Sequence, residues 1–195
     1  MPRPPNAKPL IESAALRHFV EKGIDGTSIR DVAAAAGVSE GALYRHYDSK
    51  DALVWALFAD SFTAFARRLD ALQAAANGTR AKLDAMIRGV LAFHDAEPLL
   101  FRFLLFVQHR QLEKVTPDMP NPIDKIRGVV RAGIAAGDIP PVDPELATAM
   151  TVGLVLQPAT FAAYGRIEGL LLPHAPRIAA AAWHALTACS EETSR

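Results

Sequence analysis

The stretch from Thr27 to Leu53 constrains the fold of this chain more than any other, because it predicts two capped helices around a glycine turn. Small apolar residues recur at helical spacing from Ile29 to Ala36. Gly37 follows, and glycine readily adopts the left-handed conformation that ends a helix. Ser39 is placed to cap the next helix. The pattern therefore predicts a helix-turn-helix, with its second helix presented as a recognition helix.

The two helices have distinct apolar and polar sides. A hydroxyl at Thr27 or Ser28 can cap the first helix by accepting a bond from a free backbone N–H. Leu43 and Tyr47 are the apolar positions of the second segment, and the run Tyr44-Arg45-His46 between them is predicted to face outward. A buried helical hairpin is the alternative, but it would have no use for this exposed polar run.

The string AAGVSEGALYRHYDSKDAL resembles the DNA-binding signature of the TetR family of transcriptional regulators. It agrees at polar as well as apolar positions, without a gap. The resemblance implies an all-α fold, with a three-helix DNA-binding domain at residues 1–53 and a helical effector-binding and dimerisation domain at residues 54–195. It also implies a repressor that binds a palindromic double-stranded DNA operator as a homodimer and is released by a small-molecule effector.

Carried over residue by residue, the resemblance predicts the DNA contacts. The recognition helix would face the major groove, and the Arg30 guanidinium fork matches the two acceptors on guanine. Glu40 would need a cytosine amino group to avoid repulsion by DNA. The hydroxyls and cations nearby are candidates for phosphate contacts, including the Lys50 ammonium. The predicted set is Thr27, Ser28, Arg30, Ser39, Glu40, Gly41, Ala42, Tyr44, Arg45, His46 and Lys50.

The charge balance excludes a diffuse basic surface as the source of DNA affinity. The chain has a formal net charge of zero, and residues 1–53 hold seven cations and seven anions. Binding would therefore depend on locally placed groups rather than on a general excess of positive charge.

Helical periodicity continues to the end of the chain, and no strand-like alternation is present. Met1–Pro9 is expected to be a mobile arm, and the second domain is expected to hold about six helices. Thr79 is the expected cap of one helix, while Asp143-Pro144-Glu145 is a strong start signal for another. The expected helices are Leu10–Lys22, Lys50–Ala76, one from Thr79, one from Pro98, Ile123–Ala136, Asp143–Tyr164 with a bend at Pro158, and Pro173–Cys189.

Composition favours a cytoplasmic protein. The single cysteine, Cys189, excludes an intrachain disulfide and fits a reducing compartment. No apolar run follows the cations near the N-terminus, so we expect no signal peptide. Leu146–Tyr164 is the most apolar long stretch, but Gln157 and Pro158 interrupt it, and we expect a buried interface helix rather than a membrane span.

Motifs for catalysis are lacking, and we predict that the chain is not an enzyme and has no cofactor. His94, Asp95, Glu97 and His109 contain metal-ligating groups, but their spacing does not indicate a metal site. The alternative function is a helical enzyme or small-molecule-binding protein in which the helix-turn-helix match is incidental.

The resemblance places an effector among the central helices of the second domain, and the residues there predict a largely hydrophobic one. Helical spacing puts Phe101, Leu105 and Gln108 on one face. Gln157 lies in an apolar helix next to Pro158; alternatively, its amide bonds a carbonyl that the proline frees. The predicted effector residues are Met86, Val90, Phe93, His94, Phe101, Leu105, Gln108, Gln157 and Phe161.

The resemblance also implies that the last two long helices pair with their mates as a four-helix bundle. These helices carry more apolar surface than one subunit needs. The alternative, that a given side chain faces the subunit's own core, applies to about half of the candidates. The candidates are Ala149, Gly153, Leu156, Ile178, Ala182 and Trp183.

Overall fold

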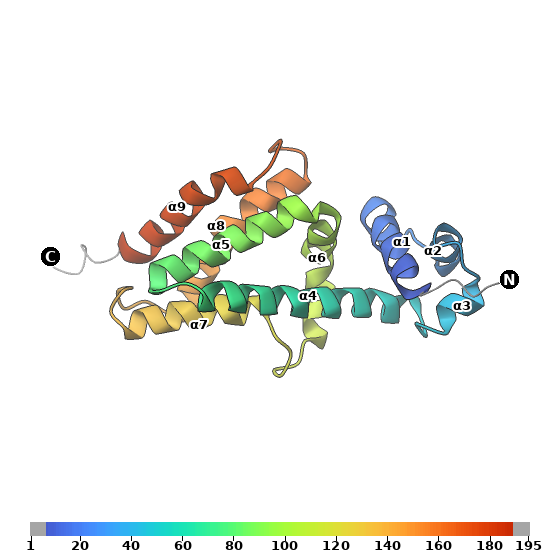
Figure 1. The fold of residues 1–195 in the computed structure, drawn as a ribbon, viewed down its shortest axis with the longest axis horizontal. Helices are drawn as coiled ribbons and strands as arrows, with labels where there is room; N and C mark the ends of the chain where they lie inside the picture. Colours follow the sequence, from blue (N-terminus) through green and yellow to red (C-terminus); the bar gives the residue numbers. More distant parts are fainter. Residues whose placement is uncertain (1–6, 189–195) are drawn as a thin grey trace. The chain divides into compact units, whose positions relative to one another are not determined.

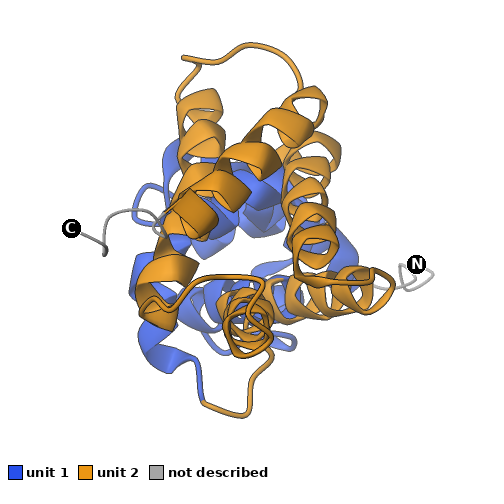
Figure 2. Cartoon of the chain, turned by 90° about the vertical axis from the view of Figure 1, so that its left-hand side faces the viewer, with its two compact units in different colours: residues 1–61, 99–116 blue, residues 62–98, 117–195 orange. Residues whose placement is uncertain are grey.

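A computed structural model describes residues 7–188, and in that range the chain is all-α, as predicted (Figure 1). The described residues form nine α-helices and two short 3₁₀ turns, and none of them lies in a strand. These helices divide into two compact units, coloured separately in Figure 2.

The first unit comprises Met1–Ser61 and Leu99–Thr116. It holds α1 (Ala7–Lys22), α2 (Ile29–Ala35), α3 (Glu40–Tyr44), the start of α4 (Lys50–Ala74), α6 (Pro98–Gln111) from Leu99 onward, and the 3₁₀ turn Leu112–Lys114. Helices α1, α2 and α3 pack on one another. Their small core contains the fully buried side chains of Ile11, Val32 and Leu43.

Helix α6 belongs to this first unit, although it follows the helix-turn-helix by more than fifty residues. The rings of Phe19 on α1 and Phe103 on α6 stack with their centroids 6.2 Å apart. An ion pair of 3.4 Å joins Arg110 to Asp25, which lies between α1 and α2. The compact units therefore differ from a simple division of the chain at residue 53.

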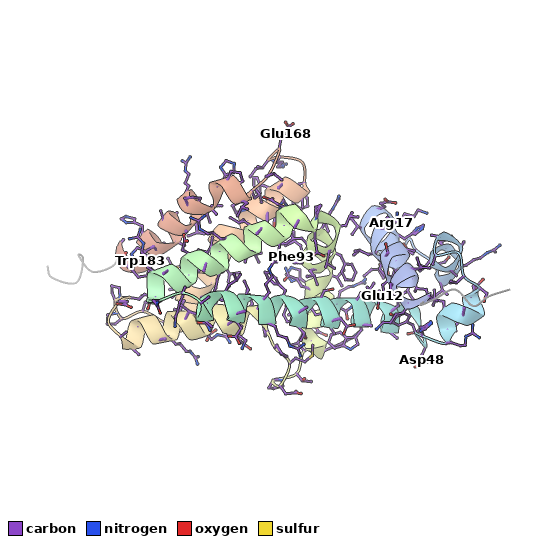
Figure 3. All side chains as sticks on the ribbon, in the orientation of Figure 1. Glu12, Arg17, Asp48, Phe93, Glu168 and Trp183 are labelled. Carbon is purple, nitrogen blue, oxygen red and sulfur yellow. The ribbon has the colours of Figure 1, made fainter. Side chains whose placement is uncertain are left out.

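The second unit comprises Phe62–Pro98 and Pro117–Arg195. After the end of α4 it holds α5 (Thr79–Ala96), α7 (Pro122–Ala135), α8 (Pro144–Ala163), the 3₁₀ turn Leu172–His174 and α9 (Ala175–Thr187). Helix α5 packs on α7, α8 and α9, and α8 packs on α7 and α9. Helix α5 is therefore the centre of the unit, and Phe93 on α5 stacks on Phe65 of α4 with ring centroids 4.7 Å apart (Figure 3).

The start signal at Asp143 is confirmed. The Asp143 carboxylate accepts hydrogen bonds from the N–H groups of Glu145 (2.7 Å) and Leu146 (3.0 Å), and Pro144 is the first residue of α8. Pro158 lies inside α8 and does not end it. Within the described chain the Gln157 side chain makes no hydrogen bond, so it does not bond a carbonyl freed by this proline.

Several helix ends differ from expectation by one to three residues, among them the end of α4 at Ala74 and the start of α9 at Ala175. The first helix begins at Ala7 rather than Leu10, because a proline such as Pro9 is tolerated in a first turn, where its N–H is not needed. Gly78, with φ +81°, caps α5 in place of Thr79, whose hydroxyl instead donates a 2.7 Å bond to Asp138. Helix α9 ends at Thr187, and the expected end at Cys189 lies outside the described residues, as do the first six residues of the expected arm.

A half-buried carboxylate connects α5 to the segment between α8 and α9. Asp95 accepts hydrogen bonds from the backbone N–H groups of Leu171 (2.9 Å) and Leu172 (2.8 Å), and it pairs with His94 Nδ1 at 2.9 Å. Burial by itself would raise the pKa of Asp95, but these hydrogen bonds together hold that pKa below its ordinary value. Asp95 therefore stabilises the turn between the last two long helices.

Candidate nucleic-acid interface

The first helix of the helix-turn-helix starts in a reciprocal cap at Ser28. Its hydroxyl oxygen accepts a bond from the Asp31 N–H at 3.1 Å, and the Asp31 carboxylate accepts bonds from the Ser28 N–H (3.1 Å) and hydroxyl (2.6 Å). These bonds from Ser28 lower the pKa of Asp31. The cap confirms that Ser28, rather than Thr27, starts the helix.

The turn between the helices has the expected form. Gly37 has φ +67°, which an L side chain adopts only with strain. The Val38 N–H then donates to the Ala33 carbonyl at 3.0 Å. Ser39 caps α3, and its hydroxyl oxygen accepts a bond from the Ala42 N–H at 3.2 Å. Local sequence signals are thus sufficient to orient α3 against α2.

Two anchors hold the recognition helix on α1. Leu43 is fully buried. Tyr47 is 6% exposed, and its hydroxyl donates a 2.6 Å bond to the Glu12 carboxylate on α1. Burial and then this carboxylate raise the pKa of Tyr47 far above its ordinary value, so the phenol stays a donor. Glu12, labelled in Figure 3, was not predicted as a functional residue, and its only sequence signal is its position on the amphipathic first helix.

Lys50 and Thr27 have structural roles that the sequence reasoning missed. The Lys50 ammonium donates to the carbonyls of Ile24 (2.8 Å) and Thr27 (3.0 Å), which connects the start of α4 to the segment before α2. Thr27 is 1% exposed, and its hydroxyl donates to the carbonyls of His18 and Gly23. Burial and these bonds leave the Thr27 hydroxyl no access to a phosphate, which corrects that prediction, whereas the Lys50 ammonium uses two of its three donors inside the module and its phosphate contact stays a prediction.

The remaining predicted DNA contacts form an exposed polar surface on α2 and α3. Tyr44 is 50% exposed although Leu43 and Tyr47 on either side of it are buried. Ala42 is half-buried, and a Cβ added at Gly41 would meet no atom within 4 Å, so the helix surface is open to close approach. The exposed members are Ser28, Arg30, Ser39, Glu40, Gly41, Tyr44, Arg45 and His46.

The arrangement has the physical properties of a DNA-reading surface. The buried and capped side of the module fixes the backbone, while hydroxyl, guanidinium, imidazole and phenol groups project from the other side. Such groups can donate to phosphates and base edges once they are held on a rigid helix. The fold and this surface define a helix-turn-helix module of the kind that binds DNA.

Comparison with known proteins then indicates a family. Residues 11–57 match the model of the bacterial regulatory proteins of the tetR family. Over 69 residues the chain is 33% identical to the transcriptional repressor KstR2 of Rhodococcus jostii, covering 35% of this chain and 34% of that protein. Over 59 residues it is 42% identical to the repressor Rv3405c of Mycobacterium tuberculosis, covering 30% and 31%. The N-terminal module is thus similar to that of TetR-family regulators, and these matches span about a third of the curated relatives' length.

Solved structures extend the likeness to nearly the whole fold. The fatty acid degradation regulator FadR of Bacillus halodurans superposes with a TM-score of 0.79 at 18% identity, covering 94% of this chain and 97% of that one. FadR of Bacillus subtilis, solved in complex with stearoyl-CoA, gives 0.73 at 19% identity, covering 89% and 96%. At these identities the likeness shows a shared fold alone.

The predicted effector residues are distributed over both units. On α5, Met86, Val90 and Phe93 are buried, and the His94 ring is hydrogen-bonded to the Asp95 carboxylate. On α6, Phe101 is buried, whereas Leu105 and Gln108 are half-buried. On α8, Phe161 is 39% exposed and Gln157 is also exposed. Neither of these two α8 side chains is enclosed in the single chain, and their role in effector binding stays a prediction.

Among the dimer candidates, Ala149 and Gly153 are exposed, and Leu156 and Ile178 are half-buried. Ala182 is only 1% exposed and faces the core of its own subunit, so it is removed from the candidates. Trp183, half-buried on α9, has the Arg80 guanidinium 5.7 Å above its ring (Figure 3). Five of the six candidates thus keep some exposed surface in the single chain, and their role in a dimer stays a prediction.

Proposed function

We propose that this chain is a cytoplasmic transcriptional repressor that binds a palindromic operator as a homodimer and releases it when a small, largely hydrophobic effector binds. The observation that carries the proposal is the exposed recognition helix α3, which is held rigidly by Leu43, Tyr47 and the Ser39 cap. The matching repressors support the same activity for the N-terminal module.

The dimer is proposed because one short recognition helix reads only a few base pairs. Two copies about 34–36 Å apart address successive major grooves. Helix α8 supports a second copy as the partner, because its exposed side carries large apolar residues; the Arg166 guanidinium lies 5.8 Å from the ring centroid of one of them, Phe161. The exposed apolar residues of α8 are Leu146, Met150, Leu154 and Phe161, with Tyr164 directly after it.

A membrane is the competing partner for such a surface. Helix α8 is long and apolar enough to cross a bilayer, with a hydropathy of 1.4, and 28% of its most apolar window is buried. One such helix in the described chain is weak evidence for a span. We favour the second copy, because α8 also packs on α7 and α9 and already has one side in the core.

Coupling of an effector to DNA binding is proposed to pass through α6. This helix carries Phe101, Leu105 and Gln108 of the expected effector residues, and its Phe103 stacks on Phe19 of α1. A displacement of α6 would therefore act directly on the helix that supports the recognition helix. The effector must bind the DNA-free state more tightly, since a ligand with equal affinity for both states shifts nothing.

Operator binding is tested with the DNA upstream of the protein's own gene in a gel shift. Tyr44→Ala should reduce specific affinity by roughly 10- to 100-fold, which corresponds to the loss of about 1–3 kcal/mol of base contact. Tyr44→Phe keeps the ring and should lose less. Equal losses on the upstream DNA and on random DNA would show that Tyr44 reads no base, and absence of specific binding by the wild type would refute the repressor.

The effector is tested with stearoyl-CoA, because a structural neighbour was solved with that ligand. Stearoyl-CoA should release the wild-type protein from DNA, and coenzyme A alone should not, since it lacks the apolar chain. Phe101→Ala should weaken release without changing DNA affinity in the absence of ligand. If stearate, stearoyl-CoA and shorter acyl chains all leave the DNA complex intact, the effector is not of this apolar class.

A further inference from the structure

Three of the predicted DNA contacts lie between two buried anchors at the end of the recognition helix. Tyr44, Arg45 and His46 are exposed. Leu43 before them and Tyr47 after them are buried. The Leu43 carbonyl accepts hydrogen bonds from the N–H groups of His46 (2.9 Å) and Tyr47 (3.1 Å). The segment is therefore one connected turn, and a displacement of either anchor moves the side chains between them.

The two anchors restrain this turn in different ways. Leu43 is the buried residue of α3, which has five residues, and an apolar contact has no preferred direction. So short a helix can rotate about such a contact. The Tyr47 hydroxyl instead donates a 2.6 Å hydrogen bond to the Glu12 carboxylate, and hydrogen bonds depend steeply on distance and angle. This bond supplies the directional restraint that the apolar contact lacks.

The acceptor of this bond lies on a different helix from the donor. Glu12 is on α1, 35 residues before Tyr47, and its neighbour Ile11 is fully buried in the core of the module. The Lys8 ammonium lies 3.6 Å from the same carboxylate oxygen, but its side chain is 49% exposed, so this pair contributes little. A bond from a buried phenol to a charged acceptor is about twice as strong as one between neutral groups. Tyr47 is therefore the main partner of Glu12.

We propose that Glu12 is a positioning residue for base recognition: through Tyr47 it sets the angle at which α3 presents Tyr44 to DNA, without contacting DNA itself. This inference rests on the DNA binding in the proposed function. Hydrogen bonds to base edges are lost after small displacements of the side chains that make them. Phosphate contacts carry no sequence information directly. Loss of the bond between Glu12 and Tyr47 therefore reduces discrimination between sequences more than it reduces affinity for DNA in general.

Selection from a pool of random-sequence DNA duplexes provides the probe for the test. The duplex that the wild type prefers is compared with a scrambled duplex of the same composition. Tyr47→Phe removes the hydroxyl and keeps both the ring and the charge of the module. The ratio of the two affinities should fall by roughly tenfold, the size of one lost base contact. The affinity for the scrambled duplex should stay nearly the same.

The outcomes of this test separate the positioning role from the proposed function. If Tyr47→Phe lowers both affinities by the same factor, or lowers neither, the bond does not position the reading side chains and the proposal is overturned. If the wild type selects no sequence from the pool, the proposed function itself fails. All variants are compared at a temperature at which circular dichroism shows full helicity, so that unfolded protein does not contribute to the difference.

Variants of Glu12 test whether this carboxylate is the acceptor that matters. Glu12→Met should lower the affinity ratio as Tyr47→Phe does, and the double variant should lower it no further, because both changes remove the same bond. Glu12→Gln keeps an acceptor oxygen and should restore most of the ratio. Glu21→Met removes an exposed carboxylate from the same helix and should leave the ratio unchanged.

Two results with these variants would overturn the role of Glu12. A lower ratio for Tyr47→Phe but not for Glu12→Met would show that the hydroxyl acts through another acceptor. Equal losses for Glu12→Met, Glu12→Gln and Glu21→Met would show that the change in charge alone is responsible.

Discussion

The helix-turn-helix and α8 differ in what their exposed surfaces consist of. On α2 and α3 the exposed side chains are mainly polar, and the residues beneath them are anchored by caps and by the bond from Tyr47 to Glu12. On α8 the exposed side is apolar from Leu146 to Phe161. The first surface offers polar groups that suit a polar ligand, whereas the second exposes large apolar side chains in the single chain.

This comparison indicates that the two surfaces respond differently to mutation. Changes on α2 and α3 should alter recognition while the fold persists, because the reading side chains are exposed. Changes on the α8 surface should alter assembly. Changes to the buried side chains that pack behind either surface should alter the free energy of unfolding.

Leu154→Glu should give the largest effect. Leu154 is 36% exposed in the single chain, so a carboxylate there is tolerated by the fold, but a second copy would bury it without a partner. We expect a loss of about 3–5 kcal/mol in dimerisation, or roughly 100-fold or more in the dissociation constant. Sedimentation measures it, with Ala132→Glu on the exposed side of α7 as the control. An unchanged dimer would exclude this side of α8 as the interface.

Gly133→Ala tests the close packing inside the second unit, where Gly133 on α7 lies against Thr79 and Ile139. An added Cβ would lie 2.4 Å from Thr79 Cγ2 and 3.0 Å from the Ile139 side chain, and Thr79 is held by its bond to Asp138. We expect a loss of about 1–3 kcal/mol in the free energy of unfolding, measured with denaturant. Gly128→Ala on the same helix is the control, since its Cβ would meet no atom within 4 Å and alanine favours a helix by up to about 1 kcal/mol. Equal effects of the two changes would contradict the close packing.

Asp95→Asn should remove a pH-dependent part of the stability. The pKa of Asp95 is depressed below 3.8, so its contribution is present above that ordinary value and is lost as the pH falls through the lower pKa of the folded state. We expect a loss of about 1–2 kcal/mol at neutral pH and a weaker acid dependence than in the wild type. Asp84→Asn, in an exposed pair with Arg88 on the same helix, should cost less. The measurement is the free energy of unfolding from pH 7 to pH 3. If it depends on pH in the same way for the wild type and for Asp95→Asn, the Asp95 carboxylate makes no pH-dependent contribution to stability.

Lys50→Met should have the smallest effect. It distinguishes a role of Lys50 in stabilising the fold from a role in binding DNA. Removal of the two bonds to the carbonyls of Ile24 and Thr27 should lower the free energy of unfolding by about 1 kcal/mol. The salt dependence of DNA binding should stay the same, because two of the three ammonium donors already hold the side chain inside the protein. If the salt slope falls by about one unit while stability is unchanged, Lys50 binds a phosphate instead.

The sequence by itself was sufficient for features that depend on neighbours along the chain. Caps at Ser28, Ser39 and Asp143 and the turn at Gly37 were all predicted, because each uses hydrogen bonds or backbone angles within about four residues. The alternation of buried and exposed residues from Leu43 to Tyr47 follows from helical periodicity in the same way. The similarity to the tetR family model follows as well, because the matched residues 11–57 include this local segment.

Only the tertiary structure decided the features that join distant segments. Thr27 and Lys50 have side chains suited to phosphates, yet the fold brings backbone carbonyls within their reach, and these bonds form inside the protein. Helix α6 belongs to the first unit because Phe103 meets Phe19, a contact between residues more than eighty positions apart. Gln157 lies on the exposed side of α8, because the packing of α8 on α7 and α9 selects which side of an almost uniformly apolar helix is buried. Hydrophobicity alone is non-directional, so the sequence of such a helix does not specify that choice.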